Sequence, residues 1–286
     1  MSRQAPVRDV APTVQRLRLR YAKRGRLRFS SHRDFQRAFE RALRRAEVPM
    51  AFSQGFNPHP RVSYANAAAT GTASEAEYVE IAVTVKLDPE KVRAALDAAL
   101  PPGLDVIEVV EVRTPDLVVR LEASVYRITL PGVDVPVAEA AVRAFMAEEV
   151  VEVERLTKNG IRRFDARGPV VALVVTSAQS PDGPAGPADP AGPADTPESD
   201  EPAGDAAGIA HPCAILELVV RHVTPSVRPD DVLAALRRVV DLVPPVPPSV
   251  VRLAQGPLVE GAENAAPQNA VSDPLIPDRE EGAIGA

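Results

Sequence analysis

Tryptophan is absent from this 286-residue sequence, and Cys213 is its one cysteine. A single cysteine forms neither an intramolecular disulfide framework nor a cysteine-based metal site. The sequence also lacks an apolar signal region at its start and any run of about 18 apolar residues, which a membrane-spanning helix requires. We therefore expect a cytoplasmic protein without a membrane partner. Its core must come from aliphatic side chains, because only 4% of the residues are aromatic.

Recognisable cofactor and metal motifs are missing as well. The four histidines, at positions 32, 59, 211 and 222, do not have the spacing of metal ligands. The sequence contains neither a glycine-rich nucleotide loop nor a nucleophile elbow. We expect no cofactor and no metal.

Charge is strongly segregated along the chain. The first 64 residues contain 15 Lys and Arg against 4 Asp and Glu, although the formal net charge of the whole is −6. Residues 178–210 hold seven acidic residues, seven prolines and no basic residue, and residues 254–286 hold six acidic residues and one basic residue. Such segments bury too little apolar surface to offset the entropy of ordering, so both are predicted to be disordered. These two segments account for much of the negative charge of the chain. The net charge of −6 therefore does not argue against a nucleic-acid partner for the folded part.

Hydrophobic periodicity predicts the order β-α-β-β-α-β in the first half of the chain. The expected strands cover residues 14–22, 61–65, 78–85 and 104–112, and the helices begin after Ser31 and at Pro89. The second half repeats the pattern, with a strand at 125–130, a helix at 136–148, a hairpin of 150–156 with 169–175, a strand at 214–223 and a helix from Pro229.

This order is the ferredoxin-like arrangement. We predict an α+β protein of two tandem ferredoxin-like units, at residues 14–122 and 123–253. The disordered segment 178–210 interrupts the second unit. A flexible tail at 1–13 and the acidic tail at 254–286 flank the pair.

Basic residues alternate with apolar ones in the first strand. Because side chains of a strand alternate between two faces, Arg16, Arg18 and Arg20 share one face. A ferredoxin-like unit leaves one sheet face free of helices, and single-strand RNA modules use that face. The row predicts binding of a polyanion such as RNA. In the alternative, Glu80 pairs with one of these arginines and the face is merely solvated.

Two further basic clusters are less specific, since exposed helices and hairpins are often charged without binding anything. The first is the outer face of the first helix: Arg33, Arg37, Arg41, Arg44 and Arg45. The second is the predicted hairpin of the second half: Arg155, Lys158, Arg162, Arg163 and Arg167.

Two histidines suggest chemistry beyond charge. His32 begins the first helix, and His59 lies in a loop that two X-Pro steps keep out of the helical region. If both converged, they could act as general acid and base in metal-independent RNA cleavage. In one alternative, His32 caps the helix and His59 belongs to the loop, and each is hydrogen-bonded only to backbone. In another, which fits better, the loop at 55–59 is a rigid recognition loop, with Asn57 and His59 donating to a ligand and Phe56 available for stacking.

Three motifs resemble one known family: Phe29 to Asp34 (FSSHRD), Phe52 to Ser63 (FSQGFNPHPRVS), and Ser74 to Tyr78 (SEAEY) after Gly71. The sequence is similar in these stretches to the radical SAM-linked proteins of bacteria, which occur alone or fused behind a radical SAM enzyme. The resemblance implies a role related to RNA or its modification, with such an enzyme as partner. This chain lacks the Cys-x3-Cys-x2-Cys that would hold the iron–sulfur cluster, so it would be the accessory part.

We therefore expect an RNA-binding accessory protein without catalytic activity of its own. It would present RNA to a radical SAM modification enzyme or a ribonuclease. One alternative is an endoribonuclease that uses His32 and His59, and another is an adaptor that docks its basic face on an acidic protein. The residues expected to bind RNA are Arg16, Arg18, Arg20, Arg28, His32, Arg33, Asn57, His59 and Arg61.

Overall fold

Local sequence signals determine where helix α1 (His32–Arg45) begins. The Ser31 hydroxyl accepts a hydrogen bond from the Asp34 backbone N–H, and the Asp34 carboxylate accepts one from the Ser31 backbone N–H. This capping box satisfies N–H groups that a helix start leaves free. Phe35 and Phe39 follow at helical spacing and are buried, as the periodicity predicts.

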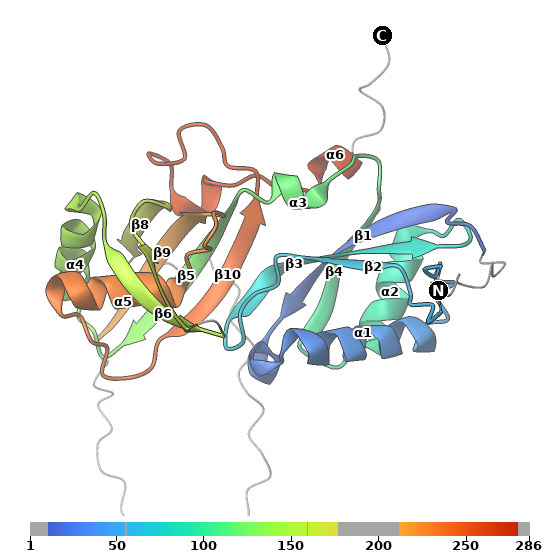
Figure 1. Cartoon of the computed structure of the whole chain (residues 1–286), viewed down its shortest axis with the longest axis horizontal. Helices are drawn as coiled ribbons and strands as arrows, with labels where there is room; N and C mark the ends of the chain where they lie inside the picture. The colour runs from blue at the N-terminus through green and yellow to red at the C-terminus, as the bar shows by residue number, and fades with distance from the viewer. Residues whose placement is uncertain (1–10, 55, 159, 177–211, 280–286) are drawn as a thin grey trace, which may run out of the picture.

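The computed structural model describes residues 11–54, 56–158, 160–176 and 212–279, which form an α+β protein (Figure 1). The first half contains β1 (Gln15–Lys23), η1 (Gly25–Phe29), α1, β2 (Val62–Ala65), β3 (Ala73–Val83), α2 (Pro89–Ala99), β4 (Leu104–Glu111) and α3 (Leu117–Arg120). The second half contains β5 (Ala123–Pro131), α4 (Val135–Ala147), β6 (Glu152–Thr157), β7 (Gly160–Asp165), β8 (Val170–Thr176), β9 (Cys213–Arg221), α5 (Pro229–Val240) and β10 (Ser249–Gly256). The short elements η2 (Pro267–Asn269) and α6 (Ile276–Arg279) follow.

One eight-stranded sheet runs through both halves in the order β4-β1-β3-β10-β5-β9-β8, and β2 also pairs with β3. All of these neighbours are antiparallel except β10 and β3, which run parallel through Val251 with Ala73 and Arg252 with Ser74. If the separate β6–β7 hairpin is left out, each half contributes four strands to the sheet. Across the sheet, the strands of each half lie in the order fourth, first, third and second along the chain: β4-β1-β3-β2 in the first half and β10-β5-β9-β8 in the second. The two halves thus repeat one strand order and join along β3 and β10.

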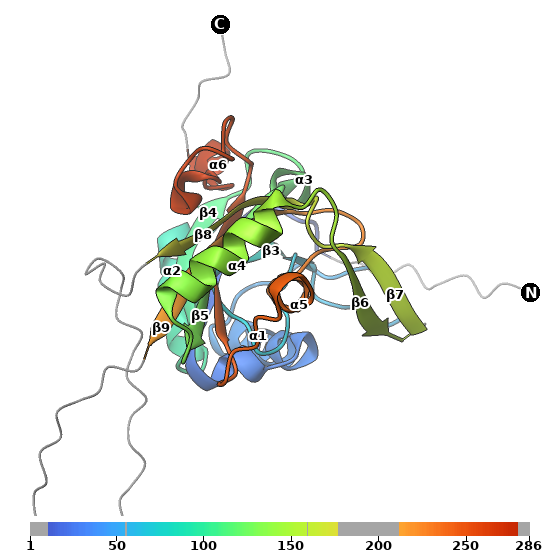
Figure 2. The ribbon, with the colours of Figure 1, turned by 90° about the vertical axis from the view of Figure 1, so that its left-hand side faces the viewer.

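Helices cover one face of the sheet in each half. Helices α1 and α2 pack on the first half, where Leu17 and Leu19 of β1 belong to the buried cluster. Helices α4 and α5 pack on the second half, and Figure 2 shows the β6–β7 hairpin projecting beside them. These faces carry the two main cores, which consist largely of aliphatic side chains as expected.

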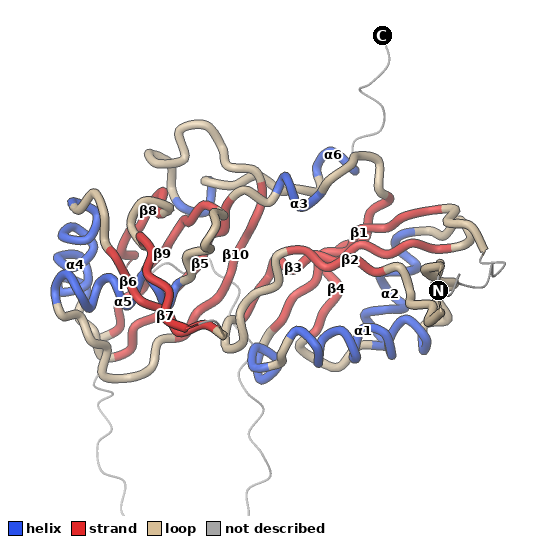
Figure 3. The backbone as a smooth tube through the Cα atoms, in the orientation of Figure 1, coloured by secondary structure: helices blue, strands red, loops and turns tan. Residues whose placement is uncertain are grey.

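The segment at residues 257–279 covers the opposite face and is not a disordered tail. It is mostly loop (Figure 3), yet Leu275 packs with residues of the first half and Ala262 with residues of the second. Asp278 is also buried. The prediction of disorder from residue 254 is therefore wrong for residues 254–279. A segment with few large apolar residues cannot form a hydrophobic core of its own, and composition predicts no more than that. This segment is ordered because individual apolar side chains pack into clusters that the sheet already forms.

The hairpin of the second half also differs from its prediction. Strand β6 pairs with β7 rather than with residues 169–175, and β8 pairs with β9 inside the main sheet. Gly160, with a φ of +102°, begins β7, so the return strand starts at the turn and not at residue 169. Strand β10 was not predicted at all.

The predicted disordered segment 178–210 and most of the tail at 1–13 lie outside the described residues. In the described part of the chain, no helix has the length and apolar character needed to cross a membrane.

Candidate functional site

The arginine row of β1 is not a free cationic surface. Arg18 has a side chain that is only 1% exposed. Its Nη1 lies 2.6 Å from Asp278 Oδ2, its Nε lies 3.0 Å from Glu80 Oε2, and its Nη2 donates to the Thr114 carbonyl at 2.7 Å. The guanidinium group is thus neutralised by a carboxylate from the segment at 257–279.

The neighbours of Arg18 are partnered as well. Arg16 forms an ion pair with Glu80, and Arg20 donates from Nε to the Glu75 carbonyl at 2.9 Å. The predicted row of accessible, unneutralised arginines is therefore wrong for Arg18, which is buried, and for Arg16, which is exposed but paired. The partner of Arg20 is a carbonyl group, which does not neutralise its charge. The predicted pairing with Glu80 is present. The face is covered at Arg18, because the chain after β10 returns over it, whereas Arg16 stays exposed.

His32 and His59 do not form a pair. His32 Nε2 lies 3.0 Å from Gln36 Nε2, and its ring packs edge-on against Tyr64 with centroids 5.0 Å apart. The exposed His59 is held through its backbone, whose N–H donates to Ser53 Oγ at 3.0 Å. The described contacts give neither histidine a carboxylate or the other histidine as a partner, so they supply no acid–base dyad.

The other predicted binding residues are mostly on the surface. Asn57, Arg33 and Arg61 are exposed, and Arg61 reaches Thr13 Oγ1 at only 3.5 Å. Arg28 donates to the Gly25 carbonyl and lies 4.5 Å from the centroid of the Phe29 ring. That ring is itself 59% exposed. An arginine stacked on an exposed aromatic ring offers both charge and a surface for bases.

The outer face of α1 is an unneutralised basic surface. Its five arginines are exposed, and none has a carboxylate within 4.0 Å among the described residues: Arg33, Arg37, Arg41, Arg44 and Arg45. At 3.6 residues per turn they fall within an arc of about 120° and extend over about 18 Å of helix. The capping box and the buried phenylalanines fix the orientation of this face.

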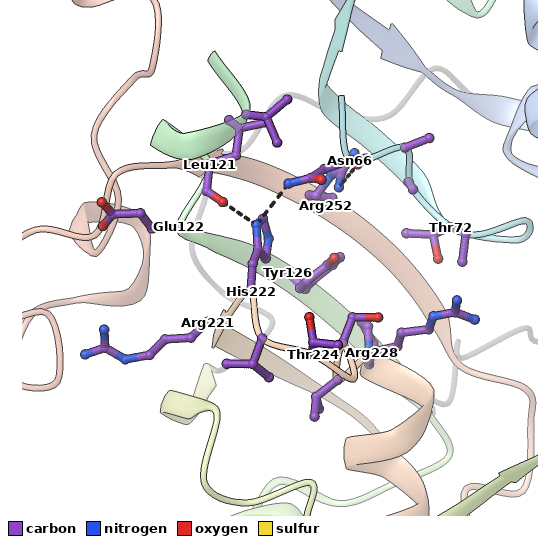
Figure 4. A pocket seen from close by; sticks show the side chains of 18 of the residues that line it. Asn66, Thr72, Leu121, Glu122, Tyr126, Arg221, His222, Thr224, Arg228 and Arg252 are labelled. Carbon is purple, nitrogen blue, oxygen red and sulfur yellow. Dashed lines mark hydrogen bonds between the residues drawn. The ribbon is translucent and has the colours of Figure 1, made fainter. Parts of the chain in front are cut away.

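A second feature, which the sequence did not indicate, is an open pocket of about 690 Å³. We call it the junction pocket, because loop 66–72 of the first half and segment 221–230 of the second half form opposing walls, with β5 and β10 between them (Figure 4). The chemically useful side chains in its lining are Asn66, Thr72, Glu122, Tyr126, Arg221, His222, Thr224, Arg228, Asp230 and Arg252.

His222 connects the walls of the junction pocket. Its Nδ1 lies 2.6 Å from the Leu121 carbonyl and 3.2 Å from the Asn66 amide, and its Nε2 lies 2.7 Å from Ser124 Oγ. A carbonyl only accepts, so Nδ1 carries the proton and Nε2 accepts from the Ser124 hydroxyl. Ser124 is completely buried, so no substrate can reach this serine–histidine pair. Its role is to hold the fold together.

Burial lowers the pKa of His222, against the smaller raising effect of its bond to the Leu121 carbonyl. The unfolded chain therefore binds this proton more readily, and the free energy of unfolding should fall as the pH drops from about 7.5 to about 5.5. We expect His222→Gln to reduce this fall. Urea unfolding of both proteins at the two pH values measures it, and equal changes would contradict the assignment.

Three buried charged side chains hold the backbone of loop 66–72. Lys23 Nζ approaches the carbonyls of residues 68 and 69 at 3.5 and 3.3 Å, and Glu77 accepts the N–H of residue 68 at 3.1 Å. Arg252 donates to the Asn66 carbonyl at 2.8 Å and pairs with Glu77. Lys23 has a lowered pKa because it is buried. Side chains of β1, β3 and β10 thus hold this wall of the junction pocket in place.

The described residues contain no cluster of three or more His, Cys, Asp or Glu side chains that could hold a metal ion.

No curated protein matches the chain. One family pattern matches residues 16–229, and its description names neither a radical SAM enzyme nor an activity. The match covers most of the chain, including α1, loop 66–72 and segment 221–230 up to residue 229. The protein therefore belongs to the family described as an uncharacterized protein conserved in bacteria, DUF2344.

Proposed function

We propose that this protein binds RNA along the outer face of α1 and presents it to a separate enzyme. The observation that supports the proposal is the set of five exposed arginines on α1 without carboxylate partners. Phosphate contacts from such a face supply most of the sequence-independent affinity of nucleic-acid-binding proteins. The proposal differs from the sequence-based expectation in its surface, since α1 replaces the arginine row of β1.

The fold supports the same interpretation. We infer that the two halves are tandem ferredoxin-like units, and the repeated order of fourth, first, third and second strands favours this. In the first unit the segment at 257–279 occupies the sheet face that RNA modules commonly use, which leaves the helix face for binding. The separation of His32 and His59 favours binding over cleavage.

The partner enzyme is part of the proposal. The resemblance of the FSSHRD and FSQGFNPHPRVS motifs to radical SAM-linked proteins favours a radical SAM modification enzyme, and a ribonuclease is the other candidate. Both chemistries act on RNA in the cytoplasm, where we place this protein.

The salt dependence of RNA binding tests the proposal. With about five phosphate contacts, the slope of log K against log salt for a single strand should be roughly −3 to −4. Fluorescence anisotropy with labelled RNA between about 0.05 and 0.3 M salt measures it. A slope near zero, or weak affinity that does not depend on RNA length, would contradict RNA binding and favour an adaptor that docks on an acidic protein.

A further inference from the structure

We infer that the junction pocket accepts one unpaired nucleotide of the bound RNA, with the base inside the pocket and a neighbouring phosphate at Arg228. This inference rests on the proposed function and adds a substrate class, RNA with unpaired residues. The pocket volume of about 690 Å³ lies in the range of small-molecule sites, about 300 to 1,000 Å³. A paired base cannot enter it, because its hydrogen-bonding edge is occupied and its ring is stacked in the helix.

The lining suits a nucleotide better than a simple anion. Hydroxyl and amide groups of Asn66, Thr72 and Thr224 can donate and accept, as the edges of bases require. The Tyr126 ring lies in the middle of the pocket, between His222 and Thr72 (Figure 4). The lining holds three arginines against Glu122 and Asp230. One of these arginines, Arg252, is already paired with Glu77, so the charge left over for a free anion is small.

Arg228 provides the phosphate contact. Its side chain is exposed and extends toward the side of the pocket where Thr72 lies, whereas Arg221 extends to the opposite side (Figure 4). Neither arginine has a carboxylate within 4.0 Å among the described residues. Arg228 can therefore bind a phosphate while the base occupies the pocket.

The pocket is fixed before any ligand arrives. The buried groups of Lys23, Glu77 and Arg252 all bond to the backbone of loop 66–72. Buried charges contribute little to stability on balance, because desolvation opposes their attraction. We therefore explain these three buried charges by their effect on the loop, whose residues are small: they make this wall of the pocket rigid. A preformed site avoids the entropy cost of ordering the loop on binding.

Loop 66–72 of the pocket also contacts the segment that precedes α1. The Gly71 N–H of loop 66–72 donates to the Arg28 carbonyl of η1 at 2.8 Å, and η1 leads directly into α1. An RNA strand that lies along α1 therefore passes η1, with its exposed Phe29, and reaches the pocket mouth.

A pocket-filling variant tests the inference. Ala67 lines the pocket and is exposed, so Ala67→Trp places an indole where the base would lie. We expect about tenfold weaker binding of a single-stranded RNA, in line with the stacking of one base, and unchanged binding of the same sequence as a full duplex. The control Ala147→Trp, at the exposed end of α4, should change neither affinity.

Arg228→Gln is a second, conservative test at an exposed position. It should reduce the salt slope for the single strand by about 0.7, the value of one phosphate contact, and leave the duplex slope unchanged. If both variants bind the single strand like the wild type, the inference is wrong, although RNA binding through α1 stands. If the wild-type protein binds neither RNA, the proposed function fails and this inference with it.

Discussion

Replacement of Arg37, Arg41 and Arg44 by glutamate should weaken RNA binding by at least roughly 100-fold at 0.1 M salt. Each single-strand phosphate contact contributes about 0.7 to the salt exponent, which corresponds to about fivefold in affinity at this salt concentration. Loss of three contacts multiplies to roughly 100-fold, and the new negative charges add repulsion. Because these side chains are exposed and have no carboxylate within 4.0 Å among the described residues, the protein should fold normally. Anisotropy titrations with single-stranded RNA measure the loss.

A matched control separates local contacts from total charge. Arg143, Arg237 and Arg238 are exposed arginines on α4 and α5 of the other half, and their replacement by glutamate changes the net charge equally. We expect less than about threefold weaker binding for this variant, because α4 and α5 lie on the other half of the sheet from α1 (Figure 1), and salt screens exposed charges beyond a Debye length of about 10 Å. Equal losses in the two triple variants would mean that α1 is not the binding surface.

Replacement of Asp278 by alanine should lower the free energy of unfolding by about 3 to 5 kcal/mol. Removal of one partner from a buried ion pair leaves the other charge without compensation, and costs of this size follow. Without Asp278, Arg18 keeps only the carboxylate of Glu80, which it shares with Arg16. The backbone N–H groups of Arg113 and Thr114, which donate to the Asp278 carboxylate at 3.0 Å each, also lose their acceptor. Urea denaturation measures the change.

Glu263→Ala is the control for this experiment, since Glu263 is an exposed acidic residue of the same segment. A change at such a surface position should stay within about 0.5 kcal/mol. If Asp278→Ala were equally mild, the segment at 257–279 would not be held to β1 by this pair.

The pH dependence gives an independent measurement of the Asp278 interaction. Burial alone would raise the pKa of this carboxyl, but hydrogen bonds from Arg18, Arg113 and Thr114 lower it to about 2. A lowered carboxyl pKa means that the unfolded chain takes up the proton first as the pH falls. About 2 kcal/mol of stability is therefore present above pH 5 and is lost as the pH falls toward 2. The Asp278→Ala protein should lack this component.

The sequence predicted the elements that depend on neighbours along the chain. The Ser31–Asp34 capping box, the apolar spacing that includes Phe35 and Phe39, and Pro89 at a helix start are local signals, and α1 and α2 begin where these signals place them. The exposed arginine stripe of α1 follows from the same spacing. The strand preceding α1 was predicted equally well, because alternation of apolar residues is sufficient to identify it.

The prediction failed where the outcome depended on distant residues. Arg18 lies on the face that alternation assigns to it, but its partner Asp278 is 260 residues further along the chain. No local pattern reveals that the acidic segment returns to the arginine row. The junction pocket is hidden for the same reason, since the contact between Asn66 and His222 spans 156 residues.

Local sequence patterns therefore define the four long helices α1, α2, α4 and α5, most of the strands, the segregation of charge, and the basic outer face of α1. Short-range hydrogen bonds and side-chain periodicity act within a few residues and need no tertiary context. Which arginines stay accessible depends on contacts between distant parts of the chain, because a buried carboxylate neutralises Arg18 while the arginines of α1 face the solvent. The existence of the pocket also depends on the tertiary structure, because the two halves must join through β3 and β10 before loop 66–72 meets His222.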